Sequence, residues 1–435
     1  MRKIGAVLCL VLLGCVAFQP TSARAAQTPI ADQPGATLLL PYFEVALPKG
    51  LTGKTKGVDT LFAINNASAT AILAHVTIWS DLSVPVLAFN VYLTGYDMQT
   101  IDLGQLLTGT LPATASAGQD PGDMISKHGS KSQDINFASC TGQLPFTQMP
   151  NDYIAHVQDA LTGQPSDFFL GLCAGLDHRD RIARGYVTVD TVNNCTLRFH
   201  SDPGYITSDL TFQNVLWGDY FYIDTKGKTG KASSLVSVRA DFSDPEVNVP
   251  GNYTFYGRYD AFTAIDHRQP LSTNFAARFV APSKSKTATF PTGSSLIVWR
   301  DSKVNQGPFP CALKPPWFPL GQEGATIFDE QEHPEVPMSI PLAPQPPIPA
   351  FAPFPAEAQR VVVGSAAFPV PFESGWVYLN LNTTVAPAGP VPPEDPAAAQ
   401  AWVTATYDAK GRYSIGYRAI QLDSAENALH FGPGF

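Results

Sequence analysis

The strongest constraint on the fold is an alternation of apolar and polar residues in strand-length runs near the start of the chain. Ala74, Val76 and Ile78 fall on one side of an extended chain, and the residues between them fall on the other. This period of two, with short turns, is typical of antiparallel strands with one buried face. It predicts an immunoglobulin-like β-sandwich over residues 26–110, with strands at residues 36–45, 59–65, 72–80, 84–93 and 98–103.

Most of the remaining chain has the same β character. Only 15% of the residues are charged, and residues that favour turns and strands, such as Gly, Pro, Asn and Thr, fill the difference. Residues 111–135 are polar and predict a long loop, whereas residues 152–161 predict one short helix. A second β-rich region is expected over residues 111–306, with strands at residues 185–192, 218–223, 235–242, 253–259, 275–280 and 295–299.

A proline-rich segment interrupts the β pattern at residues 307–360. Because proline removes a backbone donor and fixes φ, this segment is expected to run over the surface as a strap, tethered at Cys311. Strands return over residues 361–435, with alternation at residues 375–382 and a hairpin turn at residues 408–411. The expected fold class is mainly β: antiparallel immunoglobulin-like sandwiches with long polar and proline-rich loops and one short helix.

The first 25 residues have the pattern of a signal peptide. Arg2 and Lys3 precede an apolar stretch over residues 4–18, and residues 23–25 place small side chains where a signal peptidase reads them. Their removal takes away three basic residues and no acidic one, which moves the formal net charge from -9 to -12. No later apolar run is long enough to span a bilayer. We therefore expect a secreted, periplasmic or envelope protein without a transmembrane domain, and its acidity makes nucleic acid a poor partner.

A second interpretation of the leader starts from Cys15. Residues 12–15 have the outline of a bacterial lipobox, in which the cysteine becomes a lipidated N-terminus. Leu at the second position fits this motif less well than a small residue, and the apolar run continues past Cys15. Ordinary cleavage before Ala26 is the main expectation, and a lipid-anchored surface protein is the alternative.

Four cysteines remain after the leader is removed: Cys140, Cys173, Cys195 and Cys311. No spacing typical of a zinc knuckle is present, so two disulfides are expected in the oxidising space outside the cytoplasm. Three pairings are open on sequence grounds. Short loop closure favours Cys140 with Cys173, which leaves Cys195 with Cys311.

Several short segments of the chain resemble sequences of an uncharacterised family of secreted bacterial β-rich proteins. They lie at residues 38–45, 90–97, 183–190 and 214–219. The resemblance implies export and a shared architecture over much of the mature chain. It implies no activity, because none is assigned to that family.

No catalytic motif stands out in the sequence. A GxSxG nucleophile elbow, an HExxH zinc helix and an EF-hand loop are all missing. The densest acidic group could hold calcium, the one cofactor that the sequence suggests, although a solvated acidic loop explains the same pattern. Its residues are Asp329, Glu330, Glu332 and Glu335.

Aromatic residues on the less apolar faces of expected strands offer a platform for stacking sugar rings. These candidates are Trp79, Tyr92, Trp376 and Tyr378. The alternative is that these faces pack against another part of the protein.

The sequence favours an exported, non-catalytic structural or binding protein of the bacterial envelope or exterior. Its partner would be a protein or a polysaccharide outside the cytoplasm. An extracellular carbohydrate-binding protein or polysaccharide hydrolase is the first alternative, and the lipid-anchored protein is the second.

Overall fold

The computed structural model describes most of the chain between residues 33 and 423. The described ranges are residues 33–112, 149–227, 229–245, 247–250, 252–260, 264–283, 291–322, 324–335, 353–383, 399–408, 414–418 and 420–423. The expected signal peptide, Cys15 and Cys140 lie outside these ranges.

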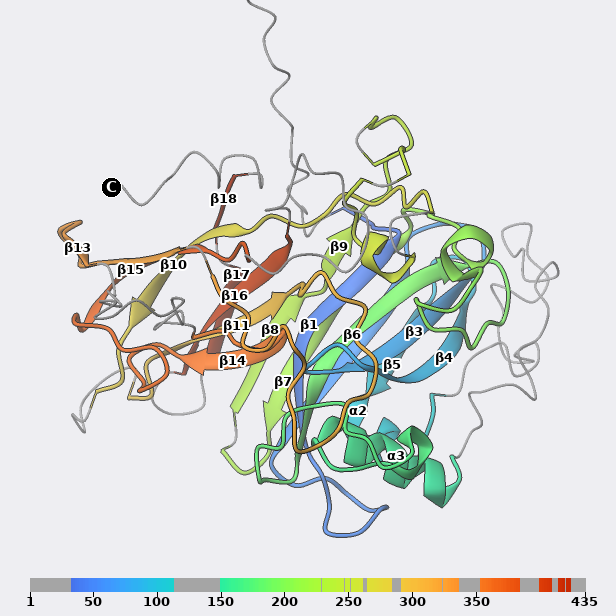
Figure 1. Ribbon diagram of the computed structural model, residues 1–435, viewed down its shortest axis with the longest axis horizontal. Coiled ribbons are helices and arrows are strands. Elements are labelled where there is room, and N and C mark those ends of the chain that lie inside the picture. Colours follow the sequence, from blue (N-terminus) through green and yellow to red (C-terminus); the bar gives the residue numbers. More distant parts are fainter. Residues whose placement is uncertain are drawn as a thin grey trace, which may run out of the picture.

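Two antiparallel sheets pack face to face to form the first sandwich (Figure 1). One sheet has the order β4-β3-β6-β1-β9 and the other has the order β5-β2-β7-β8. Their strands are β1 (Thr37–Ala46), β2 (Val58–Asn66), β3 (Ile72–Ser80), β4 (Pro85–Leu93), β5 (Met98–Asp102), β6 (Ile182–Val192), β7 (Leu216–Asp224), β8 (Thr229–Ser234) and β9 (Val236–Val238).

The predicted alternation positions the core of this sandwich. Val76 and Ile78 of β3 pair with residues of β6 and point into the layer between the two sheets. The opposite face of the same sheet is also buried, because it packs on a second core that contains Trp79 and Tyr186. A sheet covered on both faces places nearly every residue of β3 and β4 out of water.

Strand β6 lies between β3 and β1, so the first sandwich is not confined to residues 26–110. The expected border at residue 110 therefore does not separate two sheets. The mainly β, antiparallel fold class is confirmed, and the immunoglobulin-like topology stays a prediction.

A second pair of sheets contains the C-terminal strands, drawn in yellow to red in Figure 1. Their orders are β13-β12-β15-β10-β18 and β14-β11-β16-β17, and they share a core that includes Phe275, Leu296 and Leu379. The strands are β10 (Asn274–Val280), β11 (Ser294–Arg300), β12 (Gly324–Phe328), β13 (Pro334–Glu335), β14 (Ala358–Val362), β15 (Ser374–Asn380), β16 (Ala401–Asp408), β17 (Ser414–Arg418) and β18 (Ile420–Asp423).

The proline-rich segment differs in part from the expected strap. Residues 307–322 do run outside the sheets, and Trp317 and Leu320 pack on the core of the first sandwich. However, the segment also contributes β12 and β13 to one sheet of the second sandwich and the first part of β14 to the other.

The disulfide pairing expected from loop closure is wrong. Cys173 bonds to Cys311, which links the first sandwich to the proline-rich segment across 138 residues of sequence. Backbone hydrogen bonds in both directions between Cys173 and Phe309 bring the two segments together at this point. Cys195 is also disulfide-bonded, and its partner is therefore not Cys311.

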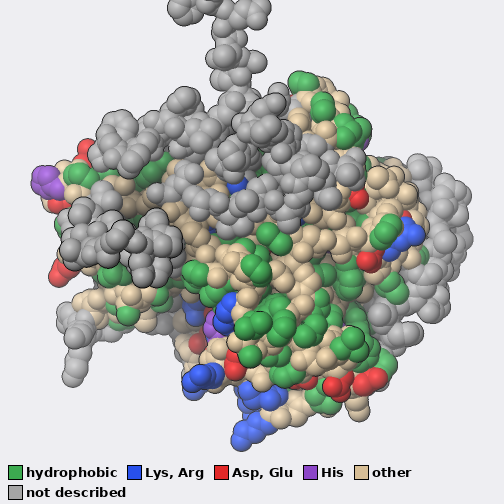
Figure 2. Space-filling view, viewed as in Figure 1, with side chains coloured by type: hydrophobic (Ala, Val, Ile, Leu, Met, Phe, Trp, Pro, Cys, Tyr) green, Lys and Arg blue, Asp and Glu red, His purple; other side chains and the backbone are tan. Residues whose placement is uncertain are grey.

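Within the described residues, α3 (Asn151–Leu161) is the only helix of seven residues or more, as the sequence predicts. A one-turn helix, α2 (Leu103–Leu106), follows β5 and begins at the Asp102 cap. No helix in the described ranges has the length and hydropathy needed to cross a bilayer. Basic side chains gather at the lower end of the face shown in Figure 2.

Candidate functional site

The outer face of the β5-β2-β7-β8 sheet exposes large aromatic side chains. Burial alternates along β2, where Phe62 and Ile64 point into the core while Leu61 and Ala63 lie on the outer side. Along β7, Tyr220 points inward, whereas Trp217 and Phe221 point outward and are each 44% exposed. This outer face is called the aromatic face below.

The register of the sheet gives the aromatic face its shape. Met98 on β5 and Trp217 on β7 are both opposite Asn65 of β2, so they lie in one row across the sheet. Trp217 and Phe221 are separated by four residues, or about 13 Å along the strand. Asp219 lies between them, and Ala232 of β8 is opposite Phe221. On the outer side of β7, the two aromatic rings thus lie on either side of the polar residue Asp219.

Trp217 is held in position by strand β2, through backbone pairing and a side-chain hydrogen bond. Its carbonyl oxygen accepts a hydrogen bond from Nδ2 of Asn65 at 3.3 Å, and β7 pairs with β2 along its full length. The face is therefore built on paired strands and not on a loop, which reduces the ordering that a ligand would have to impose.

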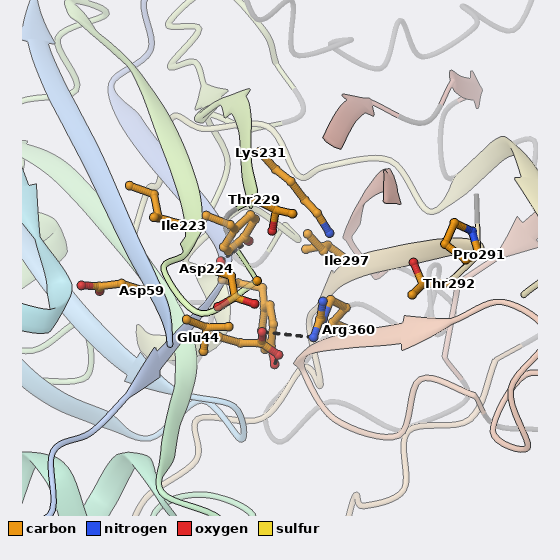
Figure 3. Close-up of a pocket in the computed structure, with 14 residues that line it drawn as sticks. Glu44, Asp59, Ile223, Asp224, Thr229, Lys231, Pro291, Thr292, Ile297 and Arg360 are labelled. Carbon is orange, nitrogen blue, oxygen red and sulfur yellow. Dashed lines mark hydrogen bonds and ion pairs between the residues drawn. The ribbon is translucent and has the colours of Figure 1, made fainter. Parts of the chain in front are cut away.

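A pocket of about 430 Å³ lies between the two sandwiches (Figure 3). Its walls come from β1, β2, β7 and β8 of the first sandwich, and from β11, β14 and the residues before β11 in the second. The volume falls within the usual range for small-molecule sites, which are common at junctions between domains.

An ion pair crosses this pocket between the sandwiches. Nη2 of Arg360 on β14 lies 3.2 Å from Oε2 of Glu44 on β1, and the hydroxyl of Tyr42 donates to Oε1 of the same carboxylate at 2.9 Å. The Tyr222 hydroxyl donates to the carbonyl oxygen of Tyr42. Burial raises the pKa of both tyrosines well above 10, so they remain neutral phenols.

Asp59 is a carboxyl group at the edge of the pocket with a raised pKa. Burial, together with the negative charge of Asp102, raises its pKa to about 6. Its carboxylate accepts hydrogen bonds from the backbone of Thr60 and Gly104 and from the Thr55 hydroxyl. In Figure 3 this carboxylate points away from Glu44 and Arg360. The two oxygens of Asp59 thus tie the loop at Thr55 and the start of α2 to strand β2.

Two clusters of charged groups between the sandwiches are closed to ligands. In the first, the Arg268 guanidinium lies between Asp190 and Asp266, at 3.0 and 2.6 Å. In the second, Arg258 pairs with Asp301 and with Glu357. All of these side chains are at most 2% exposed. They join segments that are distant in sequence and are not accessible as a site.

The acidic candidates from the sequence form a hydrogen-bonded loop beside β13. The Asp329 carboxylate accepts the backbone N–H groups of Gln331 and His333, which lower its pKa, and it lies 2.8 Å from the His333 ring. Glu330 pairs with Arg278. Among the described residues, no three His, Cys, Asp or Glu side chains come together as metal ligands. Three of these candidates, Asp329, Glu330 and Glu332, lie on this loop. The side chain of the fourth, Glu335, lies outside the described part of the structure. Calcium binding stays a prediction.

The aromatic candidates from the sequence divide into two pairs. Trp79 is 0% and Tyr92 is 6% exposed, so neither can stack on a ligand. The prediction failed for these two because both faces of their sheet are covered. Trp376 and Tyr378 do lie on the outer face of β15, half-buried, with Val377 buried on the other side. Arg278 covers the Trp376 ring at 5.4 Å.

Sequence reasoning missed the aromatic face for two reasons. The strand was expected to begin at residue 218, which left Trp217 outside it. Three consecutive aromatic residues at 220–222 then obscured the alternation, because side chains of the same type point to both faces.

Comparisons with protein-family models, curated proteins and solved structures found no match to this chain.

Proposed function

We propose that this is an exported, non-catalytic carbohydrate-binding protein of the bacterial envelope or exterior, and that the aromatic face contacts the glycan. The observation that carries the proposal is the exposure of Trp217 and Phe221 on alternate outward positions of one paired strand. Disulfide bonding at Cys173–Cys311 supports export, because such bonds persist in oxidising compartments.

The chemistry of the aromatic face suits a polysaccharide chain. A sugar ring has apolar C–H faces and polar edges, and aromatic side chains offer flat apolar area at low conformational cost. Asp219, between the two rings, and Thr100, in the same row as Asp219 across the sheet, supply hydrogen-bonding groups to hydroxyls. Two rings on positions about 13 Å apart along the strand address successive parts of an extended chain and not one small molecule.

The test is a binding assay of the oxidised, exported protein against a panel of soluble and insoluble extracellular polysaccharides. We expect at least one polymer to bind, and we expect Trp217→Ala to weaken that binding by at least tenfold, since truncating a central aromatic contact costs about 2 kcal/mol or more of binding free energy. Phe221→Ala should weaken it in the same direction. Absence of binding to every polymer would reject the proposal.

Trp376→Ala is the matched control, because it removes another partly exposed tryptophan from the outer face of a different sheet. Binding to the polymer should be unchanged in this variant. If Trp376→Ala abolished binding while Trp217→Ala did not, the glycan would occupy the outer face of β15 and the proposed face would be wrong.

A further inference from the structure

The pocket between the sandwiches is a second place where a ligand can be held, separate from the aromatic face. Its charged side chains are of both signs: Glu44 and Asp224 are acidic, and Lys231 and Arg360 are basic, while the carboxylate of a third acid, Asp59, points away from Glu44 and Arg360. Figure 3 shows Lys231 from β8 and Arg360 from β14 extending into the space between the sandwiches, near Glu44 and Asp224.

This balance of charge argues against an ionic ligand. An anion near Arg360 would also meet Glu44, whose carboxylate is 3.2 Å from the guanidinium. A cation near Asp224 would meet the positive field of the same two basic groups. Because groups of both signs line the same pocket, attraction and repulsion offset each other for a ligand of either sign.

The same lining suits a molecule that carries many hydroxyl groups. Lys and Arg are donors only, and ionised carboxylates are acceptors only, so the pocket offers both partners that a hydroxyl requires. Tyr42 and Tyr222 add aromatic surface, with their hydroxyls already engaged at Glu44 and at a carbonyl oxygen. We propose that the pocket binds a single neutral sugar ring, a proposal that rests on the carbohydrate binding proposed above.

The test compares each neutral hexose with two charged analogues, one with a carboxylate in place of the C6 hydroxymethyl group and one with an ammonium in place of the C2 hydroxyl. Glucose, glucuronate and glucosamine, and the matching galactose series, are titrated against the oxidised protein by calorimetry and ligand-observed NMR. At least one neutral hexose should bind at least tenfold more tightly than its anionic and cationic analogues. The inference is overturned if no neutral hexose binds, or if a charged analogue binds more tightly than its neutral parent.

Two variants and a control locate the binding. Lys231→Gln removes a charged donor from the pocket, and Thr229→Val removes a hydroxyl while preserving shape. Each should weaken hexose binding, by about tenfold for Lys231→Gln, since a hydrogen bond to a charged group contributes about 1.5–3 kcal/mol. Lys226→Gln changes an exposed residue of the same hairpin and should leave binding unchanged. Equal losses in Lys231→Gln and Lys226→Gln would overturn the assignment.

The two proposals fail separately. Polymer binding that depends on Trp217, without any binding of free hexoses, would reject the pocket alone. Absence of binding to polymers and hexoses alike would reject both.

Discussion

At the scale of single residues, the charged side chains buried between the sandwiches are expected to be the most sensitive to substitution. Arg268 forms ion pairs with both Asp190 and Asp266, and all three side chains are at most 1% exposed. Arg268→Met would leave two carboxylates buried without their counter-charge. We expect a loss of about 3–5 kcal/mol in the free energy of unfolding, measured by urea denaturation. Arg278→Met, which breaks the exposed pair with Glu330, should cost less than about 1 kcal/mol. Similar losses in the two variants would contradict this account.

Asp59 gives a prediction about pH at the same scale. Its folded pKa of about 6 lies above the ordinary value of 3.8, so the native state holds this proton more tightly than the unfolded chain. The stabilisation by the protonated group is full below pH 4 and is lost as the pH rises through 6. In Asp59→Asn this dependence should disappear. The variant should therefore gain stability relative to the wild-type protein between pH 4 and pH 7, measured by thermal unfolding. A difference independent of pH would contradict the assignment.

At the scale of elements, the close pairing of strand β6 with β3 requires a glycine at residue 185. A Cβ built on Gly185 would lie 1.8 Å from the carbonyl oxygen of Trp79. Gly185→Ala must displace one strand from the other and should cost about 1–3 kcal/mol of unfolding free energy. Gly230→Ala on edge strand β8 is the control, since its nearest neighbour would be 3.8 Å away. A Gly185→Ala variant as stable as Gly230→Ala would show that β6 is not packed this closely.

The strands also show which parts of the fold could be predicted from the sequence. The alternation of apolar and polar residues predicted β3 correctly, because six adjacent residues are enough to show it. The insertion of β6 between β3 and β1 joins segments more than 100 residues apart, and no local pattern specifies it. The burial of Trp79 follows from that insertion and from the second sandwich, so its exposed position was predicted wrongly. Likewise, Trp217 became visible as a site residue only when its strand partners were known.

At the scale of the whole molecule, a disulfide connects the first sandwich to the proline-rich segment, which is distant from it in sequence. Cys173 and Cys311 are 138 residues apart, and the short-loop argument failed because the proline-rich segment returns to the first sandwich. With these two paired, and with the leader removed as the sequence predicts, we expect Cys195 to bond with Cys140. Peptide mapping without reduction should recover both linkages. A fragment joining Cys140 to Cys173 would contradict the structure.

The central claim is that a glycan lies on the aromatic face, and the most direct test is oxidative footprinting of the protein with and without its bound polysaccharide. Trp217 and Phe221 should be protected by the polymer, whereas Trp376 and Tyr378 should react equally in both states. Protection confined to Trp376 and Tyr378, or no protection at Trp217 under saturating polymer, would contradict the claim.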